Sequence, residues 1–284
     1  MKRRQFLSTS IISIIAGTAY ASPPLKRIAT GYTWAEGPVE TPDGSIYFTD
    51  NREDKLHVIK PDGTIQLFLG PGSAHKANGM YLDSDGALIA CTGDPKALVK
   101  IAADGSMTTL VDSFEGAPFN APNDCYIDKK GGIYFTDPFW GKTAGRSRVY
   151  YLAPDRITLT PVIAEMIRPN GVVGSPDGKT LYVSDWDEKV TYAYSVNPDG
   201  SLWDKRQFAA VGDDGMTVDA QGNVYLTGKV VSVYSPTGKL LGEIETPETP
   251  ANVIFAGKDK KTLVITARTS VYAVEICEGT TINR

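Results

Sequence analysis

Six oxygen-bearing side chains recur at matching places along this chain. Each precedes a small polar turn by seven residues, or by eight in one case; they are Glu36, Asn78, Asn123, Asn170, Asp214 and Asn252. Taken singly, such residues are turn formers that hydrogen-bond the backbone. If the fold brings them to one axis, however, Glu36 and Asp214 would supply two negative charges, and Asn123 and Asn170 neutral amide oxygens. That set suits a hard divalent cation, Ca²⁺ above all, with Zn²⁺ and Mn²⁺ as alternatives.

The elements that must position these residues belong to a repeat. Six runs share a polar turn followed by β-branched, aliphatic or aromatic residues, and the aligned positions are Ile46, Leu88, Ile133, Leu181, Val224 and Leu263. The steps between them are 42, 45, 48, 43 and 39 residues. Such a period is typical of propeller blades. In a propeller the innermost strand of each blade lines the channel, and the segment leading into it lies at one mouth.

The second half of each repeat has room for an outer pair of strands. Val149–Leu152 with Thr160–Ile163 is one such pair, and residues 190–194 with 207–208 are another. No stretch shows a sustained 3.6-residue apolar period, so a helical domain is not expected. We predict an all-β fold, one six-bladed β-propeller with four-stranded blades over residues 22–284. Leu25–Tyr32 either adds a strand to the last blade, which would leave the ring without a free edge, or is a connecting segment that leads into the first blade.

The first 21 residues have the pattern of an export signal. Arg3, Arg4 and Phe6-Leu7 are followed by a short apolar stretch and by Ala19-Tyr20-Ala21 before Ser22. This pattern predicts a twin-arginine signal peptide cleaved near Ser22. A membrane anchor is the alternative, although the apolar run is short for a bilayer. The expected product is soluble and periplasmic or secreted, with the twin-arginine export machinery as a partner.

The charge balance argues against nucleic acid as a partner. The whole chain carries a formal charge of −4, and loss of residues 1–21, which hold Lys2, Arg3 and Arg4 and no acid, makes it −7. Nucleic-acid binding needs a basic footprint. No later segment is long and apolar enough to predict a membrane helix, and no feature predicts an oligomeric state.

The three cysteines, Cys91, Cys125 and Cys277, show no C-x-x-C spacing. Neither a zinc knuckle nor a dense disulfide framework is indicated, and at most one disulfide can form. The spacing leaves open which two, if any, would pair. Cys91 and Cys125 are expected to be small buried residues.

Other catalytic classes find little support. The chain has two histidines, His57 and His75, and neither accompanies a nucleophile elbow. His57 lies in a strand-like run and is expected at the surface. The stretch Asp83-Ser84-Asp85-Gly86 opens like an EF-hand loop, but Leu88 stands where that loop needs glycine, so a hairpin turn is expected.

Four motifs, in order, resemble the senescence-marker-protein/gluconolactonase family of six-bladed calcium-dependent propellers. They are Ala35-Glu36-Gly37-Pro38; Pro122-Asn123-Asp124 with the following Gly132–Pro138; Pro169-Asn170-Gly171 with Ser175–Gly178; and Asp214-Gly215-Met216. The resemblance covers essentially all the expected mature sequence. It implies that Glu36, Asn123, Asn170 and Asp214 bind the metal, and that the reaction is hydrolysis of a sugar lactone or similar ester.

This chain also departs from the family pattern. Animal members carry an arginine two residues before the position of Asn123, where this chain has Ala121, which places it nearer the bacterial lactonases. Trp186 and the segment Cys91-Thr92-Gly93 also differ from a typical gluconolactonase. The identity of the lactone is therefore left open.

The expected mechanism combines Lewis-acid polarisation of the lactone carbonyl with attack by water. Asp214, or alternatively Glu36, would act as the base. Asp124 would hold a metal-bound water or a ligand in place. Trp140 lies where an inner strand would exit, and it would either stack on a sugar ring or pack between blades. Asn78 and Asn252 are weaker candidates for binding substrate hydroxyls.

Two other functions stay open from the sequence. One is an organophosphate or aryl-ester hydrolase that uses the same oxygen ligands. The other is a non-catalytic binding propeller in which the metal serves only rigidity, because a fold alone does not determine function.

Overall fold

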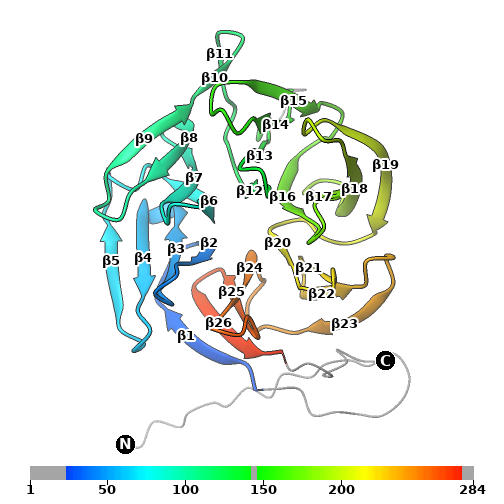
Figure 1. Ribbon diagram of the computed structural model, residues 1–284. Coiled ribbons are helices and arrows are strands. Elements are labelled where there is room, and N and C mark those ends of the chain that lie inside the picture. The colour runs from blue at the N-terminus through cyan, green and yellow to red at the C-terminus, as the bar shows by residue number, and fades with distance from the viewer. Residues whose placement is uncertain (1–23, 142–145, 277–284) are drawn as a thin grey trace, which may run out of the picture.

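Each repeat turn lies in a hairpin between the first and second strands of a sheet. In the first hairpin, Thr41 N–H donates to the Ser45 carbonyl (2.9 Å), and Ser45 N–H donates to Asp43 Oδ1 (3.1 Å). Gly44, at φ 81°, supplies the left-handed backbone that closes the turn. The computed structural model describes residues 24–141 and 146–276, and it arranges these hairpins in a ring about a central axis (Figure 1).

Six antiparallel four-stranded sheets form the blades, and the strands of each blade follow one another from the channel outward. Blade 1 has β2 (Ala35–Glu40), β3 (Ile46–Asp50), β4 (Lys55–Ile59) and β5 (Ile65–Leu69), and blade 2 has β6 (Ala77–Leu82), β7 (Leu88–Gly93), β8 (Lys96–Ile101) and β9 (Met107–Val111). Blade 3 has β12 (Cys125–Ile127), β13 (Ile133–Asp137), β14 (Arg148–Leu152) and β15 (Leu159–Ile163), and blade 4 has β16 (Pro169–Gly174), β17 (Thr180–Asp185), β18 (Val190–Val196) and β19 (Leu202–Ala209). Blade 5 has β20 (Met216–Val218), β21 (Val224–Thr227), β22 (Val231–Tyr234) and β23 (Leu240–Ile244), and blade 6 has β24 (Asn252–Ala256), β25 (Thr262–Ala267), β26 (Ser270–Glu275) and β1 (Lys26–Thr30).

The predicted six-bladed β-propeller is confirmed, and both predicted outer pairs are present as β14 with β15 and β18 with β19. The repeated runs form the second strand of each blade, and the segments before the turns form the innermost strands. Neighbouring innermost strands contact one another around the full ring, from β2 through β24 and back to β2. The oxygen-bearing residues that precede each turn therefore lie on or beside the channel wall.

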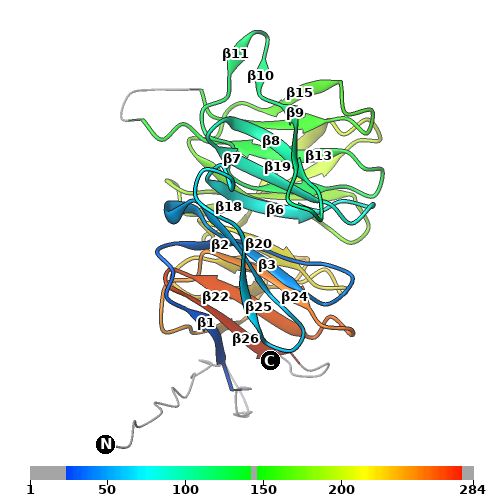
Figure 2. The ribbon, with the colours of Figure 1, turned by 90° about the vertical axis from the view of Figure 1, so that its left-hand side faces the viewer.

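The ring is closed by the N-terminal strand. β1 pairs antiparallel with β26, with Lys26 opposite Ala273, so the alternative in which residues 25–32 add a strand to the last blade is the one observed. Figure 2 shows β1 beside β26 at the edge of the molecule. The signal peptide predicted for residues 1–21, and Cys277, lie outside the described residues.

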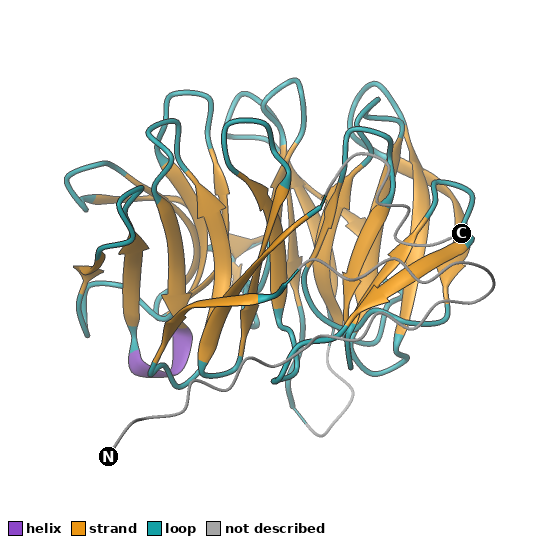
Figure 3. Cartoon of the chain, turned by 90° about the horizontal axis from the view of Figure 1, so that it is seen from below, coloured by secondary structure: helices purple, strands orange, loops and turns teal. Residues whose placement is uncertain are grey.

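Two small elements stand outside the blades. The 3₁₀ turn η1 (Asn51–Glu53) follows β3, and a hairpin of β10 (Ser113–Phe114) and β11 (Ala117–Pro118) projects from the ring (Figure 2). Figure 3 shows the strands running between two rims of loops, with η1 at one rim. Within the described residues, no helix is long and apolar enough to cross a membrane.

Packing between blades explains why the second strands are so apolar. All five residues of β13 are buried, and Tyr134, Tyr225 and Phe48 are among the largest fully buried side chains. A sheet buried on both faces needs a nearly continuous apolar strand rather than an alternating one. Cys91 and Cys125 are buried free thiols in this packing, as expected.

His57 corrects one expectation. It lies in β4, half-buried rather than at the surface, and its ring stacks on Phe48 with centroids 5.4 Å apart. Its Nε2 is enclosed without a hydrogen-bond partner among the described residues, and burial lowers its pKa. His57 lies away from the channel because β4 is the third strand of its blade, counted from the channel outward.

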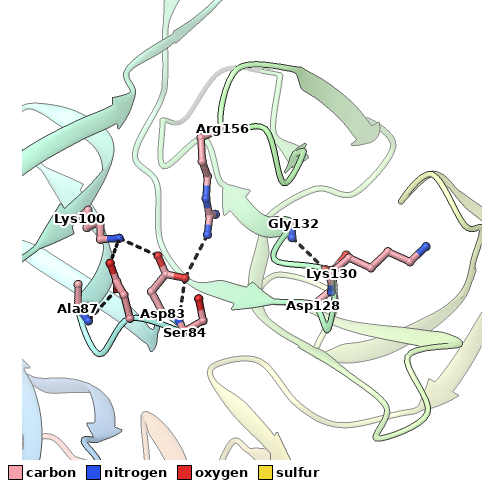
Figure 4. A network of polar contacts seen from close by, with 9 residues as sticks. Asp83, Ser84, Ala87, Lys100, Asp128, Lys130, Gly132 and Arg156 are labelled. Atoms are coloured by element: carbon pink, nitrogen blue, oxygen red, sulfur yellow. Dashed lines mark hydrogen bonds and ion pairs between the residues drawn. The ribbon is translucent and has the colours of Figure 1, made fainter.

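Polar contacts also join adjacent blades at the turn rim. Asp83, in the turn between β6 and β7, accepts from Lys100 Nζ (3.1 Å) and from a guanidinium nitrogen of Arg156 in blade 3 (3.2 Å) (Figure 4). The stretch that resembled the start of an EF-hand is a hairpin turn, as expected from Leu88, and its first carboxylate serves this ion-pair network.

Candidate functional site

The six predicted oxygen-bearing residues share one end of the innermost strands. Glu36, Asn78, Asn170 and Asn252 lie within β2, β6, β16 and β24, whereas Asn123 and Asp214 lie two residues before β12 and β20. Asn78 is half-buried, and the other five are buried. The repeat thus places one amide or carboxylate from every blade at the same end of the channel.

Contacts across the channel show that side chains from distant blades meet there. Asn252 Nδ2 donates to Asp124 Oδ2 at 3.4 Å, which joins blade 6 to blade 3 on the opposite side of the ring. The charge of Asp124 acts on Glu36, and the charge of Glu36 acts on Asp214. Three carboxyl groups from blades 1, 3 and 5 are therefore close enough to repel one another.

These carboxyls are held in an environment that opposes their ionisation. Burial, then the charge of Asp124, raises the pKa of Glu36 to about 7, although hydrogen bonds from Gly37 N–H and from the side chains of Trp34 and Asn252 oppose the shift. Burial raises the pKa of Asp124 to about 7 as well. Burial and the charge of Glu36 raise the pKa of Asp214 well above its ordinary value. A cation among them would relieve this repulsion.

Buried aspartates hold the segments that enter the site. Asp50, Asp137 and Asp185 end the second strands of blades 1, 3 and 4, and each accepts two backbone N–H groups from the chain just before the innermost strand. Asp50 accepts from Thr33 and Trp34 at 2.9–3.2 Å. Asp137 accepts from Asn120 (3.0 Å) and Ala121 (2.7 Å), and Asp185 accepts from Ile167 (2.8 Å) and Arg168 (3.1 Å). The held segments lead directly to Glu36, Asn123 and Asn170.

The residue before each of these aspartates ties its blade to the next one. Thr49 Oγ1 donates to the Asn78 carbonyl (3.2 Å), Thr136 Oγ1 to the Asn170 carbonyl (2.7 Å) and Ser184 Oγ to the Asp214 carbonyl (2.9 Å). A hydroxyl donor needs little space and satisfies a backbone acceptor that would otherwise be buried unpaired. These bonds set the spacing between successive channel residues.

Glycines allow the innermost strands to approach closely. A Cβ added to Gly79 would lie 2.2 Å from Asp124 Oδ1, and one added to Gly215 would lie 2.1 Å from Asn252 Cγ. Such distances leave no room for a side chain. Glycine is therefore required after Asn78 and after Asp214, because Asp124 or Asn252 of the next blade occupies the space that a side chain would need.

Two cavities open from the channel. One, of about 390 Å³, reaches the turn rim and is lined by Asp124, Asn252 and turn residues such as Asp128 and Asp219. The other, of about 170 Å³, lies at the opposite mouth and is lined by Asp214 together with Trp34, Trp186 and three basic residues, Lys189, Lys229 and Arg268. Asp214 is thus accessible from the mouth at which the innermost strands begin.

The remaining predicted residues fall into different settings. Trp140 follows β13, the second strand rather than an innermost one; it is 45% exposed, and its ring meets Trp186 edge to face at 5.9 Å. It therefore borders the Asp214 cavity through Trp186. Asn78 Oδ1 is enclosed and accepts no hydrogen bond among the described residues.

Sequence reasoning did not single out several residues of this site. The clamping aspartates and their preceding hydroxyls follow a visible signal, the endings Phe48-Thr49-Asp50, Phe135-Thr136-Asp137 and Val183-Ser184-Asp185 of three runs. Trp34 and Arg268 had no such signal, because they come from loops that share no motif with the repeat.

The donor set fits a hard cation. Asn123, Asn170 and Asp214 are buried residues, and within the described residues no hydrogen bond to their side-chain oxygens is found, so these oxygens can accept a ligand. The same part of the chain contains no group of three His, Cys, Asp or Glu side chains close enough to bind a metal by themselves. Any cation held at this end of the channel would depend on amide oxygens beside the carboxylates, as Ca²⁺ sites commonly do.

Comparison with known proteins places this geometry in a family. Residues 34–269 match the family model described as the SMP-30/Gluconolactonase/LRE-like region. The chain is similar to a gluconolactonase of Zymomonas mobilis subsp. mobilis, at 30% identity over 292 residues, with 89% of this chain and 81% of that protein covered.

Solved structures agree. A gluconolactonase from Xanthomonas campestris superimposes with a TM-score of 0.85 at 28% identity, covering 96% of this chain and 99% of that one. A second structure, described as a putative gluconolactonase, gives a TM-score of 0.83 at 32% identity, covering 90% and 93%. The chain therefore belongs to the SMP-30/gluconolactonase/LRE-like family.

Proposed function

We propose that this protein is a divalent-cation-dependent lactonase that opens a sugar lactone. The observation that carries the proposal is the gathering of the carboxyls of Glu36, Asp124 and Asp214, with the amide of Asn252, at one end of the channel. The names of the relatives support the reaction class, because both the Zymomonas protein and the Xanthomonas protein are called gluconolactonases.

Glu36, Asn123, Asn170 and Asp214 would hold the cation, for which Ca²⁺ is the first choice. The ligands are all oxygen atoms, and such sets suit Ca²⁺ or Mn²⁺ better than Zn²⁺, which favours nitrogen and sulfur in structural sites. When bound, the cation would polarise the lactone carbonyl and stabilise the negative charge that develops on its oxygen.

Asp214 is the proposed base for the attacking water. It lines the cavity at the open mouth, and the structure gives its carboxylate no hydrogen-bond donor among the described residues, so an oxygen is free to take a proton. Glu36 is the alternative base, but Glu36 Oε2 already accepts from Gly37 N–H (3.1 Å). A positioned base contributes about 10²- to 10⁴-fold to rate.

The other predicted site residues have positioning roles. Asp124 accepts from Cys125 N–H (2.9 Å) and from Asn252, so the two side chains fix each other across the channel. Asn78 offers a free enclosed oxygen beside them. Trp140 and Trp186 together supply an aromatic wall at the mouth on which a sugar ring could stack.

The test is a hydrolysis screen on the purified protein after chelation and after addition of Ca²⁺, Mn²⁺ or Zn²⁺. We expect aldonolactones to be opened and the rate to be lost with chelator and restored by Ca²⁺. Activity that survives thorough chelation would contradict the role of the cation. Faster turnover of a phosphotriester or an aryl ester would instead favour the other hydrolase, and a rise in Tm with Ca²⁺ but no turnover would favour a binding propeller.

We also propose that residues 1–21 direct export by the twin-arginine route, on the basis of Arg3, Arg4 and the Ala19-Tyr20-Ala21 site. Replacing both arginines with lysine should leave the precursor unprocessed inside the cell. Processing near Ser22 that continues in this variant would contradict that route.

A further inference from the structure

The mouth that exposes Asp214 carries basic groups on a protein that is acidic overall. The formal charge of the chain is −4, yet the cavity of about 170 Å³ at this mouth is lined by three basic residues and two acidic ones, namely Lys189, Lys229 and Arg268 with Asp213 and Asp214. The larger cavity at the turn rim is lined by acids such as Asp128 and Asp219 with one lysine, Lys129. The two ends of the channel therefore differ in charge, and the basic end is the one next to the proposed base.

Among these basic groups, Arg268 lies over an aromatic ring, and its charge also acts on the carboxyl of Asp214. Lys189 is neutralised by Asp213, with Nζ 2.6 Å from Oδ2, whereas Lys229 and Arg268 make no ion pair within the described residues. The Arg268 guanidinium lies over the Trp34 ring, 4.0 Å from its centroid. Arg52 lies 4.2 Å from the centroid of the same ring and likewise has no carboxylate partner in that part of the chain. Two guanidiniums thus share one indole beside the cavity.

The backbone holds Arg268 in register with the site. Ala35 N–H donates to the Arg268 carbonyl at 2.7 Å, and Ala35 immediately precedes Glu36. Arg268 itself adopts φ 48°, a left-handed conformation that is uncommon for a residue with a side chain. The loop between β25 and β26 is therefore fixed to the strand that carries Glu36.

A stacked guanidinium with free N–H groups recognises planar anions. Its forked donors match carboxylate and phosphate oxygens, and stacking on an aromatic ring orients the fork without using those donors. Neutral sugar hydroxyls would gain less than an anionic group from two guanidinium groups beside one tryptophan.

We propose that Arg268, supported by Trp34 and Arg52, forms a subsite for an anionic substituent, so that the preferred substrates are lactones carrying a carboxylate or a phosphate group. This inference rests on the proposed lactonase function, which it narrows to a substrate class. The lactone carbonyl would lie toward Asp214, and the charged substituent would lie at the mouth.

The kinetic test compares three lactones on the Ca²⁺-loaded protein: glucono-δ-lactone, which is neutral; glucaro-1,4-lactone, which carries a carboxylate; and 6-phosphoglucono-δ-lactone. We expect kcat/KM to be higher for at least one of the anionic lactones, and the better of the two identifies the charged group. Arg268→Gln should lower the ratio of anionic to neutral kcat/KM by about tenfold, because a charge-assisted bidentate contact is lost. Arg268→Lys should retain part of the ratio.

The matched control is Arg206→Gln, which removes an exposed arginine of the outer strand β19 that pairs with Asp204. It should leave the ratio unchanged. The preference should also weaken as salt is raised, since a partly exposed charge pair is screened. Equal kcat/KM values for neutral and anionic lactones, or a parallel fall for both in Arg268→Gln, would overturn the proposal.

A binding measurement separates this proposal from the proposed reaction. Methyl β-D-glucuronide and methyl β-D-glucoside differ in a carboxylate and cannot be hydrolysed as lactones. Calorimetry should show tighter binding of the glucuronide by about tenfold at low salt, and Arg268→Gln should remove most of that difference. If no lactone is opened but this discrimination is found, the reaction is wrong and the anion subsite stands. If lactones are opened but the glucuronide is not bound more tightly, the reaction stands and the anion subsite is wrong.

Discussion

Asn252 Nδ2 lies 3.4 Å from Asp124 Oδ2, although 128 positions separate the two residues in the chain. They belong to blades 6 and 3, which face each other across the ring. Because their side chains are in contact, the channel is narrow at this level. Glu36 and Asp214 come from blades 1 and 5, which flank blade 6 on either side. A cation at this level would be within reach of opposite walls, so the proposed site lies at this end of the channel.

Asp214→Asn tests the base directly. Asparagine keeps the shape and a ligating oxygen but cannot accept a proton from water at neutral pH. We expect kcat for lactone opening at saturating Ca²⁺ to fall by about 10²- to 10⁴-fold. The adjacent Asp213→Asn variant is the control, because that carboxylate already pairs with Lys189 and should affect kcat far less. Full turnover by Asp214→Asn would remove it as the base.

The carboxyl pKa values predict how stability depends on pH when the cation is removed. Burial raises the pKa of Asp124 and of Glu36 to about 7, above their values in the unfolded chain. The folded state therefore binds these protons more tightly, and the stability that this contributes is complete below about pH 4 and is lost as the pH rises through 7.

The measurement is the Tm of chelator-treated protein from pH 4.5 to 8, compared with Asp124→Asn, which cannot titrate at that position. The Tm of the wild type should fall relative to that of the variant over this range, and Ca²⁺ should recover the loss near pH 7.5. Parallel profiles for the two proteins would contradict the raised pKa.

Asp185 tests whether the clamp at the end of a second strand supports the site. Its carboxylate is fully buried and accepts from Ile167 N–H (2.8 Å) and Arg168 N–H (3.1 Å), just before Asn170. Asp185→Asn replaces a charged acceptor by a neutral one, and we expect the free energy of unfolding to fall by about 1.5–3 kcal/mol. The Ca²⁺ concentration that gives half-maximal stabilisation should rise as well. Glu245→Gln, at an exposed carboxylate with no ion pair among the described residues, is the comparison; equal losses in both variants would argue against the clamp.

Gly79→Ala tests the close approach of adjacent innermost strands. The new Cβ would lie 2.2 Å from Asp124 Oδ1 and 2.6 Å from Asp124 Cα, so the backbone of blade 3 must move. We expect the free energy of unfolding to fall by about 1–3 kcal/mol and Ca²⁺ binding to weaken. At Gly70 an added Cβ would meet only Leu67 Cδ2 at 3.8 Å, so Gly70→Ala should be tolerated. Similar thermal stability of the two variants would show that the strands can separate at no cost.

Much of this architecture could be predicted from the sequence because the repeat is local. Each blade is marked by a turn and an apolar run, and the preceding amide or carboxylate keeps a nearly constant distance, so positions such as Glu36 and Asp214 follow from counting. The resemblance then assigned them a chemistry. The fold and the family followed from these signals and were confirmed.

The rest depends on contacts that no periodicity reports. The bond from Thr136 Oγ1 to the Asn170 carbonyl joins blades, and the stacking of Arg268 on Trp34 joins the β25–β26 loop to the segment before β2. The first needs two consecutive blades to pack together, and the second needs the ring to be closed before its partners meet. His57 was misplaced for the same reason, since a polar residue in a strand gives no sign of the aromatic ring that will cover it.

The pairing of β1 with β26 makes the first and the last strand of the described chain neighbours in one sheet. A nascent chain that lacks Ser270–Glu275 can form five complete blades but has no strand on which β1 can dock. Blade 6 therefore gains its outermost strand only after β26 has been synthesised, and deletion of β1 would leave β26 as an exposed sheet edge.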